Sequence, residues 1–143
     1  MRRSSGGRKF CYLVIWRLMA RYEHLQIYKA AIDLAVYIEQ IVASFSHYHK
    51  YTLGTELRTL SHKIVVLIIK VNNMTDKRVG LTELSNILEE MKVIIHLSKE
   101  VKAFHSFNNF ETSIRYLDNV IRQCSGWIKL YKSVVPESST LVR

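Results

Sequence analysis

The sequence is poor in the residues that make tight turns and cross-links. Its 143 residues include one proline, five glycines and two cysteines, and only Gly54, Gly80 and Gly126 lie beyond residue 18. A multi-stranded β fold needs more turn residues, and a Rossmann or P-loop site needs clustered glycines, so both classes are excluded. Cys11 and Cys124 form neither a disulfide framework nor a paired zinc motif, which predicts a reducing, cytoplasmic setting.

Acidic residues are also scarce. The chain has 12 Asp and Glu against 21 Lys and Arg, and the net charge of +9 favours an acidic partner. Residues 1–18 carry five basic residues and no acidic residue, which leaves a charge of +4 for residues 19–143.

The first 18 residues match a signal peptide poorly. Their apolar run, Phe10–Trp16, is too short to span a bilayer, Arg17 interrupts it, and no cleavage site follows. We therefore expect residues 1–18 to be an extension upstream of a natural start at Met19. The alternative is a genuine basic arm or a tail that lies on a membrane surface.

Hydrophobic residues make up 48% of the chain and recur at the three- and four-residue steps of amphipathic helices. The pattern predicts four helices, over about Tyr22–Phe45, Leu53–Asn72, Thr82–Lys102 and Asn109–Tyr131. Helices about 30 Å long with short connections predict an all-α, antiparallel up-down four-helix bundle. The bundle is expected to occupy residues 19–132, followed by a fraying tail over 133–143.

The same spacing predicts the core-facing side chains and the helix starts. The first helix has one apolar stripe that includes Tyr28, Ile32 and Ala35 and a second, adjoining stripe. This wide apolar face predicts contacts with copies of the chain or with another protein. Thr52 is expected to cap the second helix by accepting a first-turn N–H, and Thr82 or an earlier residue is expected to cap the third. The remaining residues expected to face inward are Leu25, Ile38, Val42 and Phe45, with the second stripe of Ile27, Leu34 and Ile41; then Leu53, Leu57, Leu60, Ile64, Leu67, Ile68 and Val71; Leu84, Ile87, Leu88, Met91, Ile94, Ile95 and Val101; and Phe110, Ile114, Leu117, Ile121, Cys124, Ile128 and Tyr131.

Catalytic and metal motifs are not recognisable. Di-iron bundles use Glu-x-x-His pairs, and no histidine of this chain has a glutamate three residues before it. His47 and His49 are at most half of a metal site. Neither an HExxH motif nor a recognisable nucleophile motif is present, so the sequence predicts no enzyme activity, metal or cofactor.

The second predicted helix carries a row of basic residues. Lys63 and Lys70 are seven residues apart and share one side, with Arg58 nearby. Only Glu56 offsets these charges, which makes the row the stronger candidate for contact with nucleic-acid phosphates.

The fourth predicted helix carries a second basic row. Arg115, Arg122 and Lys129 follow one another at seven-residue steps. Glu111 and Asp118 lie within one turn of the arginines, so this row is either a phosphate track or a solvated face of ion pairs.

Aromatic residues gather near the predicted connections. Tyr48, Tyr51, Phe104 and Phe107 either stack on bases or close the ends of the core. We expect the two phenylalanines to belong to the core.

Four stretches of the sequence resemble one protein family. They are MARYEHLQIYKAAIDLAVYIEQIV (Met19–Val42), YHKYTLGTELRTLSHKIVVLIIKVNN (Tyr48–Asn73), LEEMKVIIHLSKEVKAFHSFNNFE (Leu88–Glu111) and NVIRQCSGWIK (Asn119–Lys129). The chain is similar here to the accessory variability determinant of diversity-generating retroelements. That group is a branch of a four-helix-bundle family that includes proteins encoded in bacterial 23S rRNA intervening sequences. The resemblance covers about residues 19–132.

The resemblance implies a homopentameric barrel of four-helix protomers with a positively charged surface. It also implies binding to the retroelement reverse transcriptase and to template RNA or cDNA, in support of mutagenic, adenine-directed cDNA synthesis that the partner enzyme catalyses. Within the matching stretches the charged candidates are Arg58, Lys99, Lys102 and Arg122, to which the basic rows add Lys63, Lys70, Arg115 and Lys129. The alternative is a structural or interaction bundle of the rRNA-intervening-sequence type, without a reverse-transcriptase partner.

Overall fold

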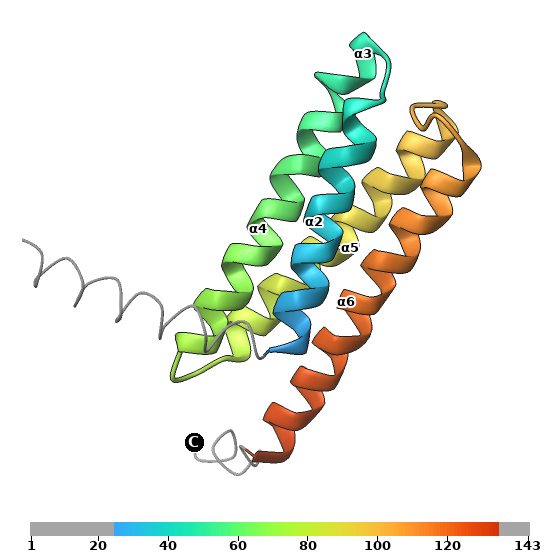
Figure 1. Cartoon of the computed structure of the whole chain (residues 1–143). Coiled ribbons are helices and arrows are strands. Elements are labelled where there is room, and N and C mark those ends of the chain that lie inside the picture. The colour runs from blue at the N-terminus through green and yellow to red at the C-terminus, as the bar shows by residue number, and fades with distance from the viewer. Residues whose placement is uncertain (1–24, 135–143) are drawn as a thin grey trace, which may run out of the picture.

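Four long helices and one short helix make up the part of the chain that the structure describes. A computed structural model describes residues 25–134, and the expected extension over residues 1–18 lies outside this range. The helices are α2 (Gln26–Ala43), α3 (His47–Lys50), α4 (Leu53–Asn73), α5 (Arg78–Glu100) and α6 (Phe107–Val134). Figure 1 shows the long helices running alternately up and down, which confirms the predicted all-α antiparallel bundle.

The long helices follow a closed square of contacts. Helix α2 packs against α4 and α6, and α5 packs against the same two helices. Because consecutive long helices are neighbours, short connections suffice, and each helix buries the side that faces the centre.

The core follows the predicted pattern most closely on α4. Leu57, Ile64 and Ile68 are fully buried, and a buried side chain of this size contributes about 1.5–3 kcal/mol. On α2 the whole adjoining stripe is buried, with Leu34 at 0% exposure, and so are Ile38, Val42 and Phe45 at the C-terminal end of the first stripe. Tyr28, Ile32 and Ala35 of the first stripe are only half-buried.

Val101, which the helical spacing places in the core, lies outside it. Val101 is 41% exposed because it is the C-cap residue of α5, where the chain leaves the helix. The helical period predicts an inward direction for Val101, but the end of the helix removes the neighbour that would cover it. Beyond the predicted bundle end, α6 continues through Ser133 and Val134; the rest of the expected tail lies outside the described residues.

Helix starts differ from the predicted caps. The Thr52 hydroxyl donates to the carbonyl oxygens of Tyr48 and His49 instead of accepting a first-turn N–H, because α3 precedes it and supplies those acceptors. Helix α5 begins at Arg78, earlier than Thr82, whose hydroxyl donates back to the Arg78 carbonyl. The N-cap residue is the earlier Lys77, but its side chain makes no capping hydrogen bond to the first turn.

Two glycines allow neighbouring helices to come close. A Cβ atom on Gly54 would lie 2.6 Å from Val42 Cγ1, and one on Gly80 would lie 2.7 Å from Val71 Cγ2. Both glycines are buried within the first turns of α4 and α5. Gly126, on α6, has nothing within 4 Å of such an atom.

Candidate nucleic-acid interface

Lys63 and Lys70 lie together in a groove between α4 and α5. The groove has a volume of about 450 Å³, and Val66 and Ile87 form part of its apolar wall. Glu83 is the acidic residue that lines it. Within residues 25–134 neither lysine has a carboxylate partner at ion-pair distance. The two ammonium groups therefore remain available for an anionic ligand.

Arg58 does not line the groove of the two lysines and pairs with a residue of α2. Its Nε lies 3.0 Å from Oε2 of Glu39 on α2, and His62 Nε2 lies 3.0 Å from the other oxygen of the same carboxylate. Arg58 is five residues before Lys63, which rotates it well away from the lysine row. The Glu39 carboxylate offsets the charge of Arg58, so Arg58 is a weaker phosphate ligand than the sequence suggested.

Arg115 and Arg122 line a second groove, of about 710 Å³, along α6. Glu111 and Asp118 line the same groove, but no ion pair joins them to the arginines within residues 25–134. The expected face of helical ion pairs is not formed, yet the groove carries charges of both signs. Lys129 is exposed farther along α6.

Lys99 and Lys102 are placed by the end of α5. Lys99 Nζ lies 3.3 Å from Glu100 Oε1 and 5.0 Å from the centre of the Phe110 ring. Lys102 has a φ of 59° and follows the C-cap residue of the helix. Its N–H donates to Lys99 O while Ala103 N–H donates to Ser98 O, the pattern of a Schellman motif. Lys99 packs locally, whereas the exposed Lys102 side chain lies at the end of the bundle.

Sequence reasoning missed a polar cluster at the opposite end of the bundle. Lys77 Nζ donates to the carbonyl oxygens of Val71, Asn72 and Met74 at 3.0, 2.9 and 2.6 Å, and so caps the C-terminus of α4. A basic residue just after a helix is a recognised signal for such a cap. The sequence contained that signal in Lys77.

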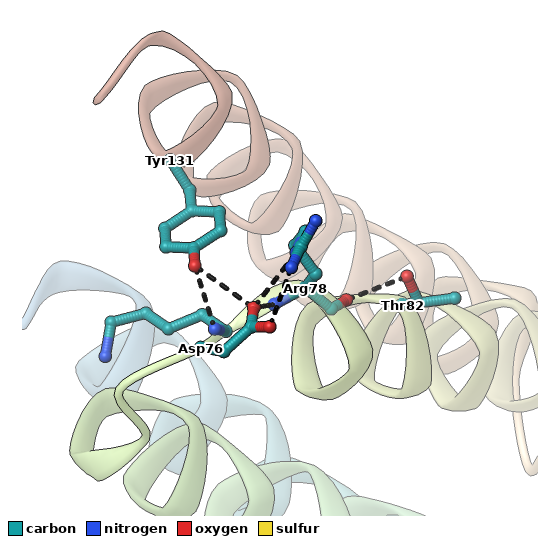
Figure 2. Close-up of polar contacts among 5 residues, drawn as sticks. Asp76, Arg78, Thr82 and Tyr131 are labelled. Carbon is teal, nitrogen blue, oxygen red and sulfur yellow. Dashed lines mark hydrogen bonds and ion pairs between the residues drawn. The ribbon is translucent and has the colours of Figure 1, made fainter. Parts of the chain in front are cut away.

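Asp76 and Tyr131 complete this cluster, as Figure 2 shows. The Asp76 carboxylate accepts the Arg78 side chain at 3.0 and 3.1 Å and the Arg78 backbone N–H at 3.1 Å. The Tyr131 hydroxyl of α6 donates to Asp76 at 3.2 Å and accepts from Lys77 N–H at 3.2 Å. The hydrogen bond from the Arg78 side chain has the largest effect, and the bond from the Arg78 backbone N–H the next largest, in holding the pKa of Asp76 well below the usual range of an aspartate. No local pattern links Tyr131 to a turn 54 residues earlier.

The aromatic residues near the connections divide into two groups. Phe104 is half-buried and packs against Phe45 and Phe110, with ring centres 5.4 and 5.9 Å apart, as expected for core. The same expectation is wrong for Phe107, the first residue of α6, which is 63% exposed. Tyr48 and Tyr51 are also exposed.

The described residues offer few chemically reactive groups. Between residues 25 and 134 there is no set of three or more His, Cys, Asp or Glu side chains placed to hold a metal ion. Burial raises the pKa of the Cys124 thiol, the opposite of the shift that activates a nucleophilic cysteine. None of the helices formed by these residues has the length and hydrophobicity that a membrane crossing requires.

The eight basic candidates do not converge on one site. Lys63 and Lys70 share the groove between α4 and α5, Arg115 and Arg122 share the groove along α6, and the other four lie elsewhere. Comparison with known protein families gives no match, and comparison with curated proteins gives none either. The chain is an all-helical, four-helix arrangement with one groove that carries Lys63 and Lys70 and a second groove of mixed charge.

Proposed function

We propose that this chain is a non-catalytic accessory subunit that binds nucleic acid and a reverse transcriptase, as in diversity-generating retroelements. The observation that supports it most is the groove between α4 and α5, where Lys63 and Lys70 have no ion-pair partner among the described residues. The sequence resemblance supplies the class of partner. The polymerase performs the chemistry, and the bundle holds template RNA or cDNA close to it.

The lysine groove is suited to a phosphate backbone. Residues seven apart on a helix are two turns, or about 10.5 Å, apart along the axis, so Lys63 and Lys70 contact separate phosphates of one strand. Each phosphate neutralised releases condensed counterions, so binding through this groove weakens steeply as salt rises. In a homopentamer, which we propose as the assembly, the groove occurs five times.

Charge reversal tests the groove. Lys63→Glu/Lys70→Glu should abolish binding of a labelled RNA at moderate salt while circular dichroism stays helical. The matched control is Lys29→Glu/Lys132→Glu, which makes the same charge change at two exposed positions outside the groove and should bind far better. Equal loss in both variants would mean that net charge, not this groove, governs binding.

Reconstitution tests the wider role. With the cognate polymerase and template RNA, addition of the protein should raise cDNA yield. The same yield with and without it would refute the accessory role.

An exposed aliphatic surface favours a second candidate, the structural or interaction bundle without a polymerase partner. Val93 and Leu97 of α5 are four residues apart, so they share one side of the helix, and they are 64% and 45% exposed. Val93→Glu should then reduce the mass measured by light scattering. A monomeric wild type at micromolar concentration would remove the pentamer. A neighbouring rRNA operon, without a reverse-transcriptase gene, would favour this second function.

A further inference from the structure

Three exposed aromatic rings are segregated to one end of the bundle. Tyr48, Tyr51 and Phe107 are 73%, 65% and 63% exposed, and they are the aromatic members of the exposed large hydrophobic residues among positions 25–134. All three lie where α3 joins α2 to α4 and where α5 leads into α6, the upper end of Figure 1. We call this region, residues 44–55 and 101–110, the aromatic end. The other exposed hydrophobic residues are aliphatic side chains or methionine.

Each exposed ring is held by a neighbouring ring. Tyr51 meets the His47 ring edge-on with centres 5.0 Å apart, and Tyr48 meets the His49 ring in the same way at 5.2 Å. Phe107 lies against Phe110 at 5.6 Å. A ring supported in this way loses little further freedom when a ligand stacks on it, so the rings are prearranged as platforms.

The aromatic end has no carboxylate of its own. Residues 44–55 and 101–110 contain Lys50 and Lys102 and neither Asp nor Glu. The nearest acidic residues in the sequence flank these segments at Glu56, Glu100 and Glu111, and Glu100 is already paired with Lys99. The aromatic end therefore presents stacking surfaces and two ammonium groups to a polyanion, with no acid among its own residues.

Phe107 connects this end to the groove of mixed charge along α6. It lines the same groove along α6 as Arg115 and Arg122, together with the acids Glu111 and Asp118. A strand whose base stacks on Phe107 thus has two guanidinium groups along its path. The mixed charge of that groove makes phosphate attraction a secondary contribution, and stacking the main one.

We propose that the aromatic end binds single-stranded nucleic acid by stacking unpaired bases on Tyr48, Tyr51 and Phe107. The proposal rests on the proposed function only in taking nucleic acid as the ligand, and it adds that the ligand is unpaired. Stacking on aromatic side chains tolerates any base and needs a free base face, which a duplex does not offer. The chemistry shared by single-stranded RNA and DNA is sufficient for it.

The make-up of the exposed surface at this end favours a base-stacking ligand over a protein surface. A protein interface is a contiguous patch whose centre mixes aliphatic and aromatic side chains. Among the exposed large hydrophobic residues of the aromatic end, three are aromatic rings and only Val101 is aliphatic. The rings at the aromatic end are interleaved with histidine, lysine and asparagine, which suits base edges and phosphates.

The test compares one triple variant with a matched control. Full-length protein is titrated into labelled single-stranded RNA, single-stranded DNA and a duplex of equal length, once in low salt and once in high salt, which suppresses phosphate contacts. Tyr48→Ala/Tyr51→Ala/Phe107→Ala should weaken single-strand binding at least about tenfold, since one stacked base alone contributes that much. Val79→Ala/Leu130→Ala removes exposed apolar side chains at the opposite end and should change nothing.

Two further variants separate stacking from other contacts. Tyr48→Phe/Tyr51→Phe keeps the ring faces and should bind single strands like the wild type. Tyr48→Leu/Tyr51→Leu keeps apolar surface without the rings and should bind weakly. Ultraviolet crosslinking of the wild type to a single-stranded oligonucleotide should map to Tyr48, Tyr51 or Phe107.

The outcomes distinguish this proposal from the proposed function. If the wild type binds duplex and single strands equally and the triple variant is unaffected, the stacking proposal is wrong while the lysine groove stands. If the wild type binds neither at any salt, both are wrong. The expected result is loss of single-strand binding in the triple variant at high salt, with duplex binding at low salt retained. A difference between the RNA and DNA arms identifies which strand is held.

Discussion

The two ends of the bundle differ in whether their polar and aromatic side chains make internal contacts. At the end where α4 turns into α5, Lys77 caps α4, Asp76 holds Arg78, and the Tyr131 hydroxyl bonds both Asp76 and Lys77. At the aromatic end Tyr48, Tyr51 and Phe107 are exposed, and no hydrogen bond from either tyrosine hydroxyl is formed within the described residues. One end uses its side chains for internal contacts, and the other leaves them to solvent or to a ligand.

The same contrast distinguishes lysines that bond within the protein from lysines that are available to a ligand. Lys77 and Lys63 are both lysines near α4, yet only Lys77 has acceptors among the described residues. Net charge counts the two equally. The contacts show that Lys63 is the one available to a partner.

Replacing a glycine at the aromatic end should have the largest effect on the free energy of unfolding. In Gly54→Ala the new methyl group meets Val42 and the His49 carbonyl oxygen, 3.3 Å away, and that backbone cannot move aside easily. We expect a loss of about 2 kcal/mol in the free energy of unfolding, measured with urea. Gly80→Ala should cost less because the Met74 thioether can shift. Gly126→Ala, with open space around it, should gain up to about 1 kcal/mol; a loss there would contradict the reasoning.

Removing the Lys77 cap of α4 should cause the next largest loss in the free energy of unfolding. Lys77→Met keeps the aliphatic stem but leaves three carbonyl oxygens without their ammonium donor. Because bonds to charged groups are the strong ones, we expect a loss of about 1.5 kcal/mol in urea unfolding. Lys63→Met should leave stability unchanged and weaken RNA binding. Equal stability of the two variants would show that the capping bonds contribute nothing.

Removing a tyrosine hydroxyl should have a smaller effect on stability, and the effect should differ between the two ends. Tyr131→Phe removes one hydroxyl that both donates and accepts, so unfolding free energy should fall by about 1 kcal/mol. Tyr51→Phe at the aromatic end should have no effect on unfolding. If Tyr51→Phe destabilises as much as Tyr131→Phe, the difference between the ends disappears.

Acid should weaken the Asp76 end specifically, and this is the smallest effect. The pKa of Asp76 is lowered by Arg78 in the folded state, so its stabilising contribution is present above the unfolded pKa, about 4, and is lost as pH falls through the folded value. Asp76→Asn should therefore flatten the fall of the unfolding temperature below about pH 4. Asp33→Asn, an exposed position on α2, is the control, and a similar flattening there would assign the effect to general charge.

Much of the fold was predictable because helical periodicity is a local property. The core of α4 and its limits at Leu53 and Asn73 follow the sequence pattern to within one residue. The errors lie where a helix ends or a neighbour intervenes. Val101 loses its cover at the end of α5, and the Thr52 hydroxyl finds acceptors in a short helix that the pattern did not predict.

The candidate site was only partly predictable. The row of Lys63 and Lys70 follows from spacing alone, and the structure adds the groove around it. Arg58 stands close to them in sequence but pairs with Glu39, because a rotation of five residues turns it toward α2. The exposure of Phe107 required the ends of four helices to be placed together.

The sequence by itself determined that this chain forms amphipathic helices, that they pack as an antiparallel bundle, and that basic residues fall in rows at helical spacing. Each of these depends on residues within a few turns of one another. Tertiary structure alone decided which charges are used internally and which remain free, and it gathered Tyr48, Tyr51 and Phe107 at one end. The physical reason is that burial and pairing depend on side chains from other helices. The spacing of residues within one helix does not determine where those side chains lie.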